Sequence, residues 1–176
     1  MKKSKVIFPQ KAIEKRIFAK MSALQTERLI EYATAEIQQI GNDMSVFPFA
    51  NNLDRTGNLL DSLCWAVYYN GSRKRAGYYR NMEASEISHL HEYSRPMGKA
   101  VSGHYMAQQF IQGYRPKNDK GWELFFAVLA PYWGYWETGF EARGKELRWQ
   151  VMTRHYDVVS NDLKSADVTF NIYRAS

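Results

Sequence analysis

The segment from residue 10 to residue 41 constrains the fold most, because it consists of good helix formers without an internal glycine or proline. This composition predicts one long helix near the start of the chain. Gly41 and Asn42 provide an end of the usual C-terminal kind. At about 1.5 Å per residue the helix would be about 45 Å long. The rest of the fold must accommodate an element of that length.

The apolar residues of this helix change sides midway. At about 100° per residue, an earlier set and a later set fall on roughly opposite faces. The earlier set is Ile13, Ile17, Met21 and Leu24, and the later set is Leu29, Ala33, Ile37 and Ile40. Either the helix breaks into a hairpin near residues 22–25, which have capping-box spacing, or its halves face different partners. In the second case the later half packs on the chain's own sheet, and the earlier half is offered to a neighbour.

Composition indicates one globular domain over residues 1–176. The chain is 45% hydrophobic and 15% aromatic, and its length suffices for a single core. No apolar run approaches the roughly 20 residues of a membrane-spanning helix, so we expect no membrane partner. Cys64 is the only cysteine, which excludes an internal disulfide and suggests a buried thiol. The net charge of +6 favours an acidic partner, either nucleic acid or protein.

Three strands and a final helix can be read from local patterns. Residues 62–69 are rich in strand formers and end at an Asn-Gly pair typical of a hairpin. Residues 122–129 form a continuous apolar run of the kind buried on both faces, and residues 167–174 alternate with period two. Residues 147–163 have helical periodicity. We therefore predict an α+β fold: a small, mostly antiparallel sheet with the long N-terminal helix and a C-terminal helix on one face.

Residues 130–139 crowd four aromatic rings, one carboxylate and two glycines into ten positions after the second predicted strand. The rings and the carboxylate are Tyr132, Trp133, Tyr135, Trp136 and Glu137. Aromatic side chains dominate both protein cores and interfaces. This aromatic corner therefore either plugs the chain's own core or anchors a partner.

A second window, residues 53–62, leads into the first predicted strand with a Thr-Gly-x-Leu-x-x-Ser pattern. Taken together, the two windows resemble the tail-completion (neck) protein family of tailed bacteriophages. The family's order of helix, Thr-Gly turn, strands, aromatic corner and final helix fits roughly residues 20–165. The family pattern falls on Thr56, Gly57 and Leu59 in the turn, and on Ala130, Tyr132, Tyr135, Glu137 and Gly139 at the corner.

Residues 71–121 depart from that family, in which a short connection joins the first two strands. They have basic ends, several glycines and weak periodicity. We interpret them as an inserted arm or loop that grips neighbours and carries a helix around residues 101–111.

The first part of that segment is the strongest candidate for contact with nucleic acid. Its cations and rings are Arg73, Lys74, Arg75, Tyr78, Tyr79 and Arg80. Such cations neutralise phosphates and such rings stack on bases. An ordinary solvated loop and a contact with an acidic protein surface are the alternatives.

The sequence contains no positive sign of catalysis. It lacks a nucleophile elbow, a phosphate-binding glycine loop and a helical pair of zinc-binding histidines. His89, His91 and His104 leave a metal enzyme as an alternative. We expect no enzymatic activity, no metal and no cofactor.

The resemblance implies a structural virion protein, made in the host cytoplasm, that sits at the head-to-tail junction of a phage. Copies of it would form a ring that joins the portal or connector to the tail. Its interface residues would be Ile13, Ile17 and Met21 of the helix together with the aromatic corner. The alternative is a basic DNA-binding or packaging accessory protein that uses residues 73–80.

Overall fold

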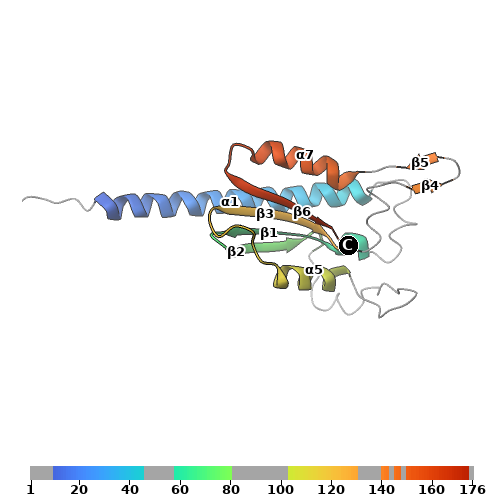
Figure 1. The fold of residues 1–176 in the computed structure, drawn as a ribbon, viewed down its shortest axis with the longest axis horizontal. Coiled ribbons are helices and arrows are strands. Elements are labelled where there is room, and N and C mark those ends of the chain that lie inside the picture. The colour runs from blue at the N-terminus through green and yellow to red at the C-terminus, as the bar shows by residue number, and fades with distance from the viewer. Residues whose placement is uncertain are drawn as a thin grey trace, which may run out of the picture.

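The computed structural model of the protein describes residues 10–45, 58–80, 103–130, 140–142, 145–147 and 150–174. These residues build an α+β fold in which a four-stranded sheet carries helices on both faces (Figure 1). The predicted fold class is confirmed, and the first and last helices lie on one face as expected. A further helix on the other face was not predicted to pack there.

The strand order of the main sheet is β2-β1-β3-β6. Its strands are β1 (Leu63–Tyr69), β2 (Ser72–Tyr78), β3 (Trp122–Val128) and β6 (Val168–Arg174). Strand β1 pairs antiparallel with β2 and β3, whereas β3 and β6 are parallel. Parallel neighbours need a long crossover, and here the crossover contains helix α7 (Val151–Leu163).

The Asn-Gly pair after the first predicted strand forms the hairpin turn that it indicated, and the turn leads into β2. Asn70 and Gly71 have positive φ angles of 49° and 72°. A two-residue turn with both φ angles positive matches the twist of the strands that it joins. Asn70 also accepts a hydrogen bond from the Gly121 N–H through its side chain, at 2.9 Å. The turn is thereby tied to the start of β3.

The interpretation of residues 71–121 as an inserted arm or loop is wrong for the parts that the structure describes. Residues 72–78 form edge strand β2, and residues 103–113 form helix α5 (Gly103–Gly113), which packs on the sheet. The predicted helix around residues 101–111 is therefore confirmed. Strand β2 has no apolar alternation because its first half is exposed and basic, as befits a protected sheet edge. Residues 81–102 lie outside the described residues.

Helix α1 (Gln10–Ser45) is continuous, so the predicted break near residues 22–25 is wrong. Ser22 does not cap a new helix: its carbonyl accepts a hydrogen bond from the Thr26 hydroxyl at 2.8 Å, and its own hydroxyl meets the Tyr69 hydroxyl at 3.1 Å. The helix also continues through Gly41 to Ser45. Its 36 residues span about 54 Å.

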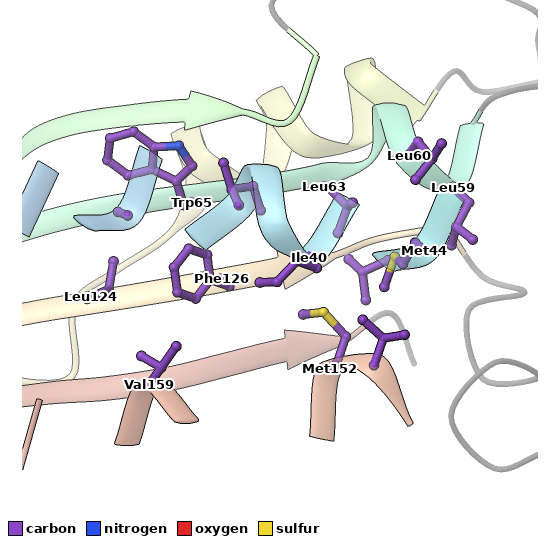
Figure 2. Packing of buried hydrophobic residues seen from close by; sticks show 14 of the residues in the cluster. Ile40, Met44, Leu59, Leu60, Leu63, Trp65, Leu124, Phe126, Met152 and Val159 are labelled. Atoms are coloured by element: carbon purple, nitrogen blue, oxygen red, sulfur yellow. The ribbon is translucent and has the colours of Figure 1, made fainter. Parts of the chain in front are cut away.

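The main core lies between the sheet and the pair α1 and α7. Figure 2 shows Trp65, Phe126, Ile40 and Met152 pointing into this layer from two strands and two helices. The predicted later stripe of α1 (Leu29, Ala33, Ile37 and Ile40) is buried in it, with at most 3% of any of these residues exposed. The alternation of β1 and β3 sends their other side chains to the opposite face.

On that opposite face, α5 covers a smaller and more aromatic core. Ala107 and Ile111 of α5 pack against the sheet, and the rings of Phe110 and Phe125 meet edge to face with centroids 5.4 Å apart. The continuous apolar run in β3 is explained by this arrangement, because helices cover both faces of that strand.

The remaining elements are short. Helix α3 (Asn58–Asp61) precedes β1, and β4 (Phe140–Ala142) pairs with β5 (Lys145–Leu147) as a separate hairpin (Figure 1). The predicted C-terminal helix therefore begins at Val151, since residues 145–147 are extended. Among the helices in the described part of the chain, none combines the length and the apolar character that crossing a membrane requires.

Candidate functional site

The first half of α1 extends beyond the sheet, as Figure 1 shows, and its side chains from residue 14 to residue 21 are all exposed. We call residues 14–28 the overhang. Its apolar side chains do not face the protein's own core. The large exposed ones are Ile17 (54% exposed), Phe18 (65%), Met21 (65%) and Leu24 (56%).

Two of the predicted interface residues, Ile17 and Met21, thus form an exposed stripe with Leu24. Ile13 belongs to α1, but its side chain is outside those that the structure describes. Phe18 joins the stripe and was missed, because at about 100° per residue it lies at the margin of the face that the periodicity selected. Its position directly after Ile17 was the sequence signal that could have identified Phe18.

The end of the sheet fixes the direction of the overhang. Trp122, at the start of β3, donates an indole hydrogen bond to the Thr26 hydroxyl at 3.2 Å, while Tyr69 meets Ser22. Ser22 and Thr26 are buried, at 7% and 8% exposed. These bonds hold α1 on the last residues of β1 and on the first of β3. The stripe, which runs from Ile17 to Leu24, is therefore presented on a helix anchored at its C-terminal end.

The predicted nucleic-acid residues of β2 are mostly used within the fold. Arg73 donates to the Ile111 carbonyl at 3.0 Å, which satisfies a carbonyl near the end of α5. Arg80 bonds the carboxylate of Asp61 at 3.0 Å, and that carboxylate is buried. Lys74 lies over the Tyr69 ring, 5.8 Å from its centroid.

The two predicted stacking tyrosines are also engaged. The Tyr78 ring packs at a tilt against His104 of α5, with centroids 4.4 Å apart. The Tyr79 hydroxyl donates to the side chain of Asn42 at 3.1 Å. Arg75 remains exposed on the strand. Strand β2 therefore presents fewer groups to a nucleic acid than its sequence indicates.

The two windows that carry the phage resemblance meet at Ser62. Its buried hydroxyl donates to the Leu59 carbonyl at 2.8 Å and accepts from the backbone N–H groups of Leu129 and Ala130 at 3.1 and 3.0 Å. Leu59 and Ala130, both predicted motif residues, are themselves buried. The structure thus gives the two windows a common packing role.

The other motif residues lie outside the described residues. These are Thr56 and Gly57 of the turn, and Tyr132, Trp133, Tyr135, Trp136, Glu137 and Gly139 of the aromatic corner. The predicted choice between core and interface for those rings stays open. Ala130 places the start of the corner just beyond β3, beside Ser62, which follows α3.

His155 of α7 bridges two carboxylates of α1. Its Nδ1 lies 2.6 Å from Glu36 Oε1, and its Nε2 lies 3.0 Å from Asp43 Oδ2. Burial lowers the pKa of His155, but the two hydrogen-bonded carboxylates outweigh burial and raise it above its ordinary value. Both ring nitrogens donate in the charged form. The two carboxylates therefore favour the protonated ring, and the histidine ties α7 to α1.

Glu123 in β3 is a buried carboxylate with local donors. It is 1% exposed and accepts from the Tyr114 hydroxyl and from the backbone N–H groups of Lys117 and Asn118, the latter two at 3.0 and 3.2 Å. Tyr114 also contacts the Tyr173 hydroxyl at 2.8 Å. Burial, followed by the bond to Glu123, raises the pKa of Tyr114. The network fixes the loop after α5 to the sheet.

The described residues do not bring together the set of metal ligands that the metal-enzyme alternative requires. His104 lies 3.0 Å from the Gln108 amide nitrogen, and burial lowers its pKa. His89 and His91 are outside the described residues. Within the described ranges, no three side chains of His, Cys, Asp or Glu are grouped so as to hold a metal ion. Burial raises the pKa of the Cys64 thiol, which makes it a poor nucleophile.

Comparison of the chain with protein-family models, with curated proteins and with solved structures found no match.

Proposed function

We propose that the protein is a structural virion component at the head-to-tail junction of a tailed bacteriophage. Copies of it form a ring that joins the portal or connector to the tail. The exposed stripe of Ile17, Phe18, Met21 and Leu24 carries the proposal. A monomeric enzyme has little use for an apolar stripe on a helix that projects from its own core.

Two further observations support the proposal. The order of α1, β1, β3 and α7 agrees with the order of elements that the phage resemblance implies. The two resembling windows also share the Ser62 hydroxyl. Because Leu59, Ser62 and Ala130 are buried together, these parts of the two windows have a physical reason to occur in one sequence.

This function can be tested by introducing substitutions into the parent phage and examining its particles. Replacing Phe18 and Met21 with glutamate should leave the chain folded, because both side chains are exposed, but should yield filled heads without attached tails. Gln39→Glu is the matched control, since Gln39 is an exposed residue of the same helix outside the overhang. Electron microscopy of the particles and their plaque titre give the readout. Intact necks and normal titre in the double variant would refute the proposal.

The DNA-binding alternative rests on the net charge and on exposed Arg75. A DNA-binding protein should lose affinity steeply as the salt concentration rises. A neck protein should instead co-purify with portal or tail proteins and bind DNA weakly at any salt concentration. Titration of labelled duplex DNA at low and physiological salt separates the two.

A further inference from the structure

We infer that the overhang pairs with the overhang of a second copy of this chain, antiparallel, about a two-fold axis through Met21. The exposed stripe defines the contact face. At about 100° per residue, its apolar members all lie within about 60° of Met21 around the helix. Ser22, Thr26 and Ala33, which face the sheet, lie about 100–140° away. The stripe therefore points away from its own sheet.

The residues on either side of Met21 complement one another when a copy is turned end to end. Phe18 and Leu24 stand three positions before and after Met21 and about 60° to either side of it, so each lies level with the other across the axis, on the opposite edge of the contact. Glu14 and Arg28 stand seven positions before and after it. Both lie within about 20° of Met21 around the helix. An antiparallel pair thus closes with two Glu14–Arg28 ion pairs, one at each end of the apolar contact.

A parallel pair lacks this complementarity. It would place Glu14 against the second copy's Glu14, and Arg28 against its Arg28. Like charges that face each other destabilise helix pairs, whereas flanking charges of opposite sign set their orientation. The charge pattern therefore selects the antiparallel arrangement.

The fold leaves space for a second helix along the overhang. A hydrogen bond from Tyr32 to Asp162, at 2.9 Å, joins α1 to α7. Tyr32 stands one turn beyond Arg28, so α7 lies beyond the Glu14–Arg28 pair and next to the first turn of the second copy's helix, which begins at Gln10. The sheet meets α1 on another face, through Ser22 and Thr26.

The contact is small compared with the roughly 800 Å² per partner of a standard interface. It should therefore form in a concentration-dependent way. It is also isologous, so it joins copies in pairs and does not by itself close a ring. It uses the same stripe that supports the proposed phage function, but does not require that function, and a ring would need a second surface in addition.

Sedimentation equilibrium of the full chain over a range of concentrations tests the pairing and its charges. Glu14→Arg alone and Arg28→Glu alone should each raise the dimer dissociation constant by about tenfold or more. The double exchange should return it to within about threefold of the unaltered chain. Circular dichroism confirms that each variant is folded, and Gln39→Arg is the control outside the paired segment.

Cross-linking with a short bismaleimide tests the orientation. Cys64 is fully buried, so an introduced cysteine is the only accessible thiol among the described residues. Phe18→Cys mixed with a size-tagged Leu24→Cys should give the mixed product in an antiparallel pair. A parallel pair would instead join Phe18→Cys to itself.

Three results would overturn the inference. The first is a monomer at every concentration, and the second is a predominance of symmetric cross-links. The third is binding of a monomer to anionic lipid vesicles that Met21→Glu abolishes, because an apolar stripe with basic neighbours also suits a membrane surface. Failure of the phage experiment alongside a confirmed pair would count against the neck function alone.

Discussion

The hydroxyl of Ser62 accepts a hydrogen bond from the backbone N–H of Ala130 at 3.0 Å. The same oxygen also bonds Leu129 and Leu59, so it joins the entry of β1 to the exit of β3. Ser62 is fully buried. Water cannot replace these bonds, and the hydroxyl sets how the two segments pack at this end of the sheet.

Ser62→Ala should destabilise the protein by about 1–3 kcal/mol, because two buried N–H groups lose their acceptor. Urea unfolding followed by circular dichroism measures the change. Ser45→Ala is the matched control: its hydroxyl bonds the Asn42 carbonyl on the exposed end of α1. That control should change stability by less than about 0.5 kcal/mol. Equal effects of the two substitutions would contradict the bridging role of Ser62.

His155 should make the protein more stable in mild acid than in mild alkali. Its folded-state pKa lies above the ordinary 6.5, so the stability that it contributes is complete below that pH. This contribution is lost as the pH rises through the folded-state pKa. The free energy difference between the unaltered chain and His155→Gln should therefore shrink from pH 5.5 to pH 9.

Urea unfolding of both proteins across that pH range provides the measurement. The comparison with the variant is needed because His104 has a lowered pKa and so contributes a slope of opposite sign. A free energy difference that stays constant with pH would show that His155 is neutral in the folded protein.

Arg80→Ala should lower the free energy of unfolding by about 1–3 kcal/mol, because it removes a cation from the buried Asp61 carboxylate. The Arg80 side chain is 41% exposed, and solvent screening keeps the loss below that of a fully buried pair. Arg75→Ala, in strand β2 just before Arg80, should have an effect under about 0.5 kcal/mol. Thermal unfolding compares them. An Arg80→Ala variant of unchanged stability would instead favour Arg80 as a contact residue for an external partner.

Gly41→Ala should destabilise the protein although alanine favours helices by about 1 kcal/mol. A Cβ at this position would lie 2.2 Å from the Tyr79 ring. That ring cannot easily move, because its hydroxyl bonds Asn42 and the Tyr79 carbonyl bonds Gln38. We expect a net loss of about 1–3 kcal/mol.

Gly113→Ala is the control for the close approach, because a Cβ there would meet nothing within 4 Å. It should be neutral or slightly stabilising. Chemical denaturation measures the free energy of unfolding of both variants. A Gly41→Ala variant that is more stable than the unaltered chain would show that the Tyr79 ring moves to accommodate the new Cβ.

Local pattern predicted much of the fold. The apolar stripe at Leu29, Ala33, Ile37 and Ile40 indicated the buried half of α1, and the Asn-Gly turn indicated the β1–β2 hairpin. Strand β2 escaped detection because its first half faces solvent and carries charge. The predicted end of α1 was wrong because a glycine in sequence looks like a helix end, whereas Gly41 lies against the Tyr79 ring within the helix.

A long helix with two apolar faces could be inferred from sequence, because helical periodicity is a property of neighbouring residues. Which face meets the sheet, and where the sheet ends, depends on contacts between distant segments such as Trp122 with Thr26, so both appeared only in the folded structure. For the same reason the sequence did not show that Arg80 serves Asp61 and that Arg73 serves α5. Partners that are distant in sequence leave no periodic trace in it.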